Sequence, residues 1–197
     1  SRSYTSGTLS TVQHALRELV ADEEVANADL SVINPEQDAT ALLIDKLQLG
    51  IERRLNALLF DSTTTFASYT AAATAYWDAS TTYIETDIDA AKDSVRKKAG
   101  VEPNTIVIPP AIAAIAKKTT ELRTLVQYTD PTLLINGDLP PKLFGLDVLI
   151  PKPLFNEANP GVSTASLDYL YDDKAVWVGY VEKAAPSKRS LSCFYRF

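Results

Sequence analysis

The sequence predicts an α+β fold in which one long helix accompanies a smaller α/β lobe. Apolar residues recur at helical spacing between residues 34 and 61, strand and helix patterns alternate between residues 101 and 165, and residues 166–197 alternate as antiparallel strands do. Hydrophobic residues make up 46% of the 197 residues and charged residues 22%. A chain of this size and balance buries a core without disulfides or metals.

The long helix is predicted over residues 34–61. Asn34 supplies an N-cap oxygen, Pro35 suits the first helical position, and acidic residues follow where the helix dipole favours them. One apolar stripe runs along it, made of Ala39, Leu43, Leu47, Ile51, Leu55 and Leu58 and widened by Leu42, Leu59 and Phe60. At 1.5 Å per residue the helix is about 40 Å long, a spine that Gly50 weakens locally.

The remaining elements follow from capping, turn and periodicity signals. In chain order we expect a helix at 84–99 stopped by Gly100, a buried strand at 105–108 ended by two prolines, a helix at 111–128, a short helix at 139–144 and a strand at 147–150. Segments 175–181 and 190–197 should pair as antiparallel strands. Together, segments 101–165 predict an α/β lobe.

Two segments lack a strong period. Residues 1–33 are predicted to form an extended arm or a hairpin that leads into an acidic turn at 22–29. Residues 61–82 are rich in Ser, Thr and Ala and predict an irregular loop or edge strands. Their aromatic residues are expected to anchor the segment to the core; these are Phe66, Tyr69, Tyr76 and Trp77.

The sequence offers little to support catalysis or a cofactor site. His14 is the one histidine and Cys193 the one cysteine, so a zinc site and an internal disulfide are excluded. His14 is a weak catalytic candidate, because no spacing places a Ser or Cys and an orienting group beside it, and a packed or interfacial histidine is the favoured interpretation. The seven glycines form no phosphate-binding loop, and the clustered carboxylates at 22–24 and 168–173 lack the spacing of calcium loops. We therefore expect no enzyme activity, no cofactor and no metal.

Charge and hydropathy restrict the partners. The net charge of −6 argues against a protein that coats nucleic acid, and the pairs Lys117–Lys118 and Lys188–Arg189 are too small to form a basic stripe. The apolar runs are too short to cross a bilayer. Because the chain contains no Met, we expect that residues are missing upstream, through initiator removal, trimming by a maturation protease or a segment outside this sequence.

The order of these segments resembles a large family of phage major capsid proteins. The resemblance rests on several short runs, each weak alone: DEEVANAD at 22–29, NPEQDATALLIDKL at 34–47, IERRL at 51–55, Trp77 with DIDAA at 87–91, GVEPNTIVI at 100–108, LVQYT at 125–129 and LFGLDVLI at 143–150. Their order over residues 15–155 is the specific feature.

The resemblance implies the Hong Kong 97-type shell fold. It divides the chain into an extended arm at 1–33, a peripheral domain with the spine helix at 34–100, an axial domain at 101–165, and C-terminal strands at 166–197 that return to the peripheral domain. It also implies a virion protein, assembled in the host cytoplasm into hexamers and pentamers around double-stranded DNA, with portal and scaffold or decoration proteins as partners.

Two alternatives stay open at this point: an encapsulin-like nanocompartment shell, which shares the fold, and a monomeric α/β ligand-binding domain. For a shell protein, the candidate inter-subunit contacts are His14, Glu52, Arg53, Arg54, Lys188 and Arg189. The simpler interpretation is a packed histidine and charged side chains that face solvent, with neighbours one helical turn away.

Overall fold

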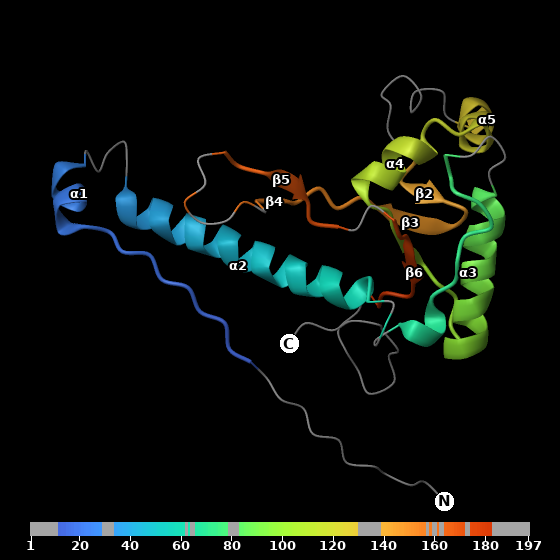
Figure 1. Cartoon of the computed structure of the whole chain (residues 1–197), viewed down its shortest axis with the longest axis horizontal. Helices are drawn as coiled ribbons and strands as arrows, with labels where there is room; N and C mark the ends of the chain where they lie inside the picture. Colours follow the sequence, from blue (N-terminus) through green and yellow to red (C-terminus); the bar gives the residue numbers. More distant parts are fainter. Residues whose placement is uncertain are drawn as a thin grey trace, which may run out of the picture. The chain divides into compact units, whose positions relative to one another are not determined.

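The computed structural model describes residues 12–28, 34–61, 63, 66–78, 83–129, 139–156, 158, 161, 164–171 and 174–182. The chain divides into two compact units, Ser1–Arg54 and Leu55–Phe197, and the division falls inside one continuous helix, α2. The first unit holds α1 and most of α2. The second holds a four-stranded sheet, a two-stranded sheet and three further helices, α3 to α5 (Figure 1).

The long helix α2 confirms the sequence prediction, with Pro35–Leu59 in place of 34–61. The Asn34 side-chain oxygen accepts a hydrogen bond from the Gln37 backbone N–H at 3.3 Å, so the expected N-cap is present. The apolar stripe, however, is poorly covered by the chain itself. Leu59 is the one buried residue of the helix, and Leu42 and Leu58 keep 46% and 47% of their surface exposed.

The segment before α2 is extended over 12–21, as predicted for an arm. The acidic turn expected at 22–29 contains instead a short helix, α1 (Asp22–Asn27), with three carboxylates in its first turn. Carboxylates there interact favourably with the backbone N–H groups that a helix leaves without partners. The arm is therefore extended first and helical afterwards.

The four-stranded sheet has the order β2-β3-β1-β6, with β1 (Thr105–Val107) between β3 (Leu146–Leu149) and β6 (Trp177–Gly179). Strand β1 runs parallel to β3 and antiparallel to β6, while β2 (Lys142–Leu143) pairs antiparallel with β3. The register places Val178, Ile106 and Val148 side by side on one face. That face of the sheet packs against the helices and forms one side of the core.

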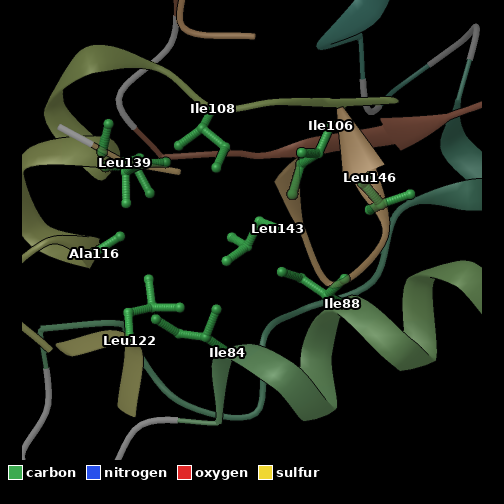
Figure 2. Packing of buried hydrophobic residues seen from close by; sticks show 11 residues of the cluster. Ile84, Ile88, Ile106, Ile108, Ala116, Leu122, Leu139, Leu143 and Leu146 are labelled. Carbon is green, nitrogen blue, oxygen red and sulfur yellow. The ribbon is translucent and has the colours of Figure 1, made fainter. Parts of the chain in front are cut away.

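The core of the second unit lies between this face and the helices. Ile84 and Ile88 of α3 (Ile84–Ala99), residues of α4 (Pro110–Ala116) and Leu122 of α5 (Thr120–Thr129) join Ile106 and Leu146 in one buried cluster. In Figure 2, Leu143 lies in the middle of these side chains. Burial of a branched apolar side chain contributes about 1.5–3 kcal/mol, so this cluster is the main source of the unit's stability.

Helix α3 has the predicted bounds and the predicted stop at Gly100, which adopts a left-handed φ of 70°. Its N-terminus is capped from another helix, which the sequence did not predict. The Glu121 carboxylate of α5 accepts hydrogen bonds from the backbone N–H groups of Ile84 at 3.1 Å and Glu85 at 2.9 Å. This contact ties the start of α3 to α5.

The single helix predicted at 111–128 is wrong, because the chain forms α4 and α5 with a break at 117–119. Thr119 lies in the break, and its hydroxyl donates a 2.7 Å hydrogen bond to the carbonyl of Ala116. Thr residues compete with the helix for backbone partners in this way, and two β-branched residues in succession weaken it further. The helix restarts at Thr120 with a new direction (Figure 1).

The short helix predicted at 139–144 is also wrong. Residues 139–141 lead into β2 (Lys142–Leu143), which forms a hairpin with β3 through Phe144 and Gly145. Both turn residues have positive φ, 48° and 83°, as a two-residue hairpin turn requires. The ammonium group of Lys92 on α3 donates a 2.5 Å hydrogen bond to the Phe144 carbonyl and holds the turn against the helix.

The predicted strand at 175–181 is confirmed as the shorter β6, but its described partner is β1. The Asn104 side chain extends this pairing: its amide donates to the Val181 carbonyl and its oxygen accepts from the Val181 N–H, each at 2.9 Å. Segment 190–197, including Cys193, lies outside the described residues. Its pairing with 175–181 stays a prediction, as does the division into arm, peripheral and axial domains.

The loop predicted at 61–82 is irregular where it is described, apart from a 3₁₀ turn at Ala67–Tyr69. Trp77 packs against the core and its ring N–H reaches the Asp87 carboxylate at 3.4 Å, so it anchors the segment as expected. Tyr76 does not, because 86% of its surface is exposed. Tyr69 is 60% exposed and lies outside the core, but its ring contacts the Lys98 ammonium group of α3 at 4.4 Å.

Replacing Ile106 with Ala should lower the free energy of unfolding by about 2–5 kcal/mol, because a fully buried side chain leaves a cavity in the core. Urea denaturation followed by circular dichroism measures this loss. The matched control is Ile115→Ala on α4, where 36% of the side chain is already exposed and about 1 kcal/mol or less is expected. Equal losses at the two positions would contradict the assigned core.

Replacing Glu121 with Ala should cost about 1–2 kcal/mol of stability, since two backbone N–H groups at the start of α3 lose a charged acceptor. Glu121→Gln keeps one acceptor oxygen and should cost less than Glu121→Ala. Hydrogen exchange at Ile84 and Glu85 should accelerate in the Ala variant. Unchanged exchange there would show that α3 begins without this contact.

Candidate interaction surface

Most described cations of the second unit already have a partner within the chain. The Arg96 guanidinium donates hydrogen bonds of 2.8 Å and 2.7 Å to the Glu102 carboxylate, which raises the pKa of Arg96 above its ordinary value. Lys97 pairs with Asp93 at 2.5 Å. These cations belong to the surface of α3 and are not free for a partner.

The two arginines of α2 differ from these paired cations. Arg53 and Arg54 are exposed on its second half beside the half-buried Glu52, and no ion pair reaches these three from the described part of the chain. His14 is exposed on the extended segment, so it is not a core histidine. Lys188 and Arg189 lie outside the described residues. The contact roles predicted for all six residues stay predictions.

Within the first unit, a groove of about 760 Å³ runs between the extended segment, α1 and the start of α2. Its lining combines the carboxylates of Glu18, Glu23, Glu24 and Asp38 with the apolar side chains of Leu19, Val20, Ala39 and Leu42. Leu19 is 84% exposed, so the apolar part of the groove is open to solvent. A groove with this lining suits an apolar segment that carries positive charge.

The acidic character of the groove reflects a long one-sided stretch of sequence. Between Arg17 and Lys46 there is no Lys or Arg, while the carboxylates are Glu18, Asp22, Glu23, Glu24, Asp29, Glu36, Asp38 and Asp45. Lys46 pairs with Glu18 at 3.5 Å. Among the described residues, no cation pairs with Glu23, Glu24 or Asp38, so most of this negative charge is uncompensated within the chain.

A second exposed surface lies on the two-stranded sheet of β4 (Leu154–Asn156) and β5 (Leu167–Tyr169). The register pairs Leu154 with Tyr169 and Asn156 with Leu167, so all four side chains share one face. Leu154, Leu167 and Tyr169 are 48%, 65% and 46% exposed. Because an isolated two-stranded sheet is marginal in water, this apolar face gains most from being covered.

The described residues form no metal centre. No three of their His, Cys, Asp and Glu side chains lie close enough together to hold a metal ion. No helix in the described part of the chain is both long and apolar enough to cross a bilayer. What the surface presents is an acidic groove, unpaired arginines and apolar faces, which are the features of a protein that binds other proteins.

Comparison with known families decides the identity. A sequence profile of the phage capsid protein family matches residues 6–186. The chain belongs to the phage capsid protein family. This is a family of virion structural proteins and not of enzymes, in agreement with the absence of a catalytic motif in the sequence. No curated protein sequence gives a significant match to this capsid protein.

The fold of this capsid protein is similar to the crystal structure of a phage-related protein from Bordetella bronchiseptica RB50. The TM-score is 0.59 at 19% sequence identity, and the match covers 81% of this chain and 52% of the other. The capsid protein therefore spans about half the length of that chain. Both combine a long helix with sheets in an α+β arrangement, which confirms the fold class at that level.

Sequence reasoning singled out Arg53 and Arg54, whose contact role stays a prediction, and it did not indicate the groove or the apolar sheet face of the capsid protein. Strands β4 and β5 have three residues each, too few for an alternating pattern to stand out. The groove could have been suspected from the run of carboxylates after Arg17, although its shape depends on α1.

Replacing Leu154 and Leu167 together with Thr should weaken self-association of the capsid protein while leaving its folding intact. Thr keeps the strand propensity, and both side chains are already about half exposed, so the unfolding free energy should change by less than about 1 kcal/mol. Sedimentation velocity and urea denaturation measure the two effects. Leu149→Thr, at a strand residue that is 53% exposed, is the control. Unchanged association of the double variant would contradict the role of this face.

Proposed function

We propose that this capsid protein assembles with copies of itself into a closed icosahedral shell that encloses phage double-stranded DNA. The observation that carries the proposal is the family match over residues 6–186, which covers both units of the chain. Shell formation needs surfaces that bind identical neighbours, and it needs no catalytic residues.

The exposed surfaces support this function. The extended segment presents Val12 at 72% and Leu16 at 51% exposure, and the β4–β5 face adds three more apolar side chains. Scattered apolar residues are normal on a protein surface, but an extended segment and a sheet face that are both apolar are typical of association sites. In an assembled shell these surfaces are covered by neighbouring subunits.

The proposal includes the Hong Kong 97-type fold. In it, residues 1–33 are the arm, residues 34–100 the peripheral domain with α2 as its spine, residues 101–165 the axial domain, and residues 166–197 the C-terminal strands. Strand β6 pairs with β1, so residues 177–179 also contribute to the sheet of the axial part. Axial domains meet around five- and six-fold positions, and the arm overlaps a neighbour.

DNA is contained in this proposal and not bound tightly. The net charge of −6 opposes contact with phosphate groups, so packaged DNA slides along the inner wall. The further partners are a portal protein and scaffold or decoration proteins, and assembly takes place in the host cytoplasm.

The test is the mass and shape of the purified chain in solution. Light scattering after size-exclusion chromatography, followed by electron microscopy, should show closed particles of megadalton mass whose formation depends on protein concentration. Nuclease-protected DNA in particles from infected cells should accompany them.

Two outcomes would contradict the proposal. A chain that stays monomeric at all concentrations would favour the ligand-binding alternative, for which no specific observation exists. Particles that enclose a cargo enzyme in place of DNA would favour the nanocompartment alternative.

A further inference from the structure

The first unit carries two complementary features at opposite ends of α2. Near the helix start lies the acidic groove, with Glu23, Glu24 and Asp38 in its lining. Toward its other end, Arg53 and Arg54 project from the helix without an ion-pair partner among the described residues. Each feature therefore lacks the opposite charge that the other supplies.

The two features cannot neutralise each other within one copy. Asp38 and Arg53 are both in α2, fifteen residues apart, which corresponds to about 23 Å along a helix. Charges in physiological salt are screened beyond roughly 8 Å. The groove and the arginines of a single chain therefore stay unpaired for as long as α2 remains helical, and a second copy is the simplest source of a partner.

Gly50 provides an independent indication that a partner approaches α2 at the arginines. Glycine is among the least favourable residues in a helix interior, and a Cβ built on Gly50 would meet no atom within 4 Å apart from its chain neighbours and the backbone of its own helix, so no close approach in the described structure requires it. Arg53 and Arg54 follow it by three and four residues and share its face of the helix. The missing side chain leaves the backbone there open to close contact.

We propose that this bare face of α2, with Gly50, Arg53 and Arg54, docks into the acidic groove of a second copy of the chain. The apolar lining of the groove, with Leu19 and Leu42, receives apolar side chains of the docked helix such as Leu47, which precedes Gly50 by three residues. The arginines then lie among Glu23, Glu24 and Asp38. This inference rests on the proposed function and names one of the contacts that build the shell.

The contact is heterologous, because it joins the start of α2 in one copy to the second half of α2 in another. A heterologous contact that repeats by rotation generates a closed ring, whereas an isologous contact stops at a dimer. Five- and six-membered rings are what the proposed shell requires. Each exposed ion pair is weak and sensitive to salt, so the ring should loosen as ionic strength rises.

Charge reversal tests the contact directly. Glu23→Lys with Glu24→Lys should raise the protein concentration at which particles form by about tenfold or more, and Arg53→Glu with Arg54→Glu should do the same, since like charges then meet. The chain with all four reversals restores opposite charges at the contact and should assemble at close to the original concentration. Lys118→Glu with Arg123→Glu, at exposed cations of the second unit, changes the charge equally and is the control.

A neutral variant is the control for a disruption of α1 by the two introduced Lys residues. Glu23→Gln with Glu24→Gln keeps the side-chain shapes and should raise the assembly concentration by a smaller factor, roughly threefold, because attraction is removed without repulsion being added. Circular dichroism and thermal unfolding of each variant below the assembly concentration show whether the monomer is intact.

Gly50→Gln gives a second readout. Gln has a higher helix propensity than Gly and meets open space in the monomer, so the helix should become more stable while assembly becomes weaker. Ala90→Gln, at an exposed position of α3, is the matched control and should leave assembly unchanged. Normal assembly of Gly50→Gln would overturn the docking arrangement.

The outcomes separate this inference from the proposed function. If the unaltered chain forms no particles, the proposed shell function fails and the contact with it. If the unaltered chain assembles and both reversed variants assemble equally well, only the contact fails. A four-fold reversed chain that assembles no better than either double variant would also overturn the pairing of these two surfaces.

Discussion

The incomplete burial of the apolar face of α2 is the constraint on which the rest of the molecule depends. A helix in water is stabilised mainly by packing of its apolar face, and this helix runs for 25 residues with Leu59 as its one buried residue. The Asn34 cap fixes its start, and near its end the Asn56 amide donates a 2.8 Å hydrogen bond to the distant Leu170 carbonyl. The half-exposed stripe between them is therefore surface that is available for neighbours.

In the second unit, by contrast, the apolar side chains of the central strand are buried by the chain itself. Strand β1 is buried at all three positions, between β3 and β6 and beneath α3 and α4, so this unit completes its core without help from another copy. Close packing extends to the backbone: a Cβ at Gly179 would lie 2.3 Å from the Trp177 ring, which explains the glycine there. The two units therefore differ: the second has a complete core of its own, whereas the apolar stripe of α2 stays half exposed.

The sequence predicted those elements whose signals are local. The cap at Asn34, the stop at Gly100 and the prolines after β1 each act within a few residues, so α2, α3 and β1 were placed correctly. The two wrong predictions have different causes. The break between α4 and α5 is local, because the Thr119 hydroxyl donates to the Ala116 carbonyl three residues earlier. The turn at Phe144, which Lys92 of α3 holds from a distance in sequence, replaces the expected short helix by a hairpin. The groove depends on three segments that meet in space and has no pattern along the chain.

The proposed contacts also explain why a capsid protein should leave complementary charges unpaired. A closed shell forms correctly when each contact is weak enough to break and re-form while misplaced subunits leave, and exposed ion pairs have that property. Apolar faces such as β4–β5 supply the affinity that charge alone lacks, without specifying which neighbour binds. The groove and the arginines determine which surface of a neighbour binds, because two grooves or two arginine faces repel each other. Charge would then set the direction in which subunits join, and apolar burial would hold them.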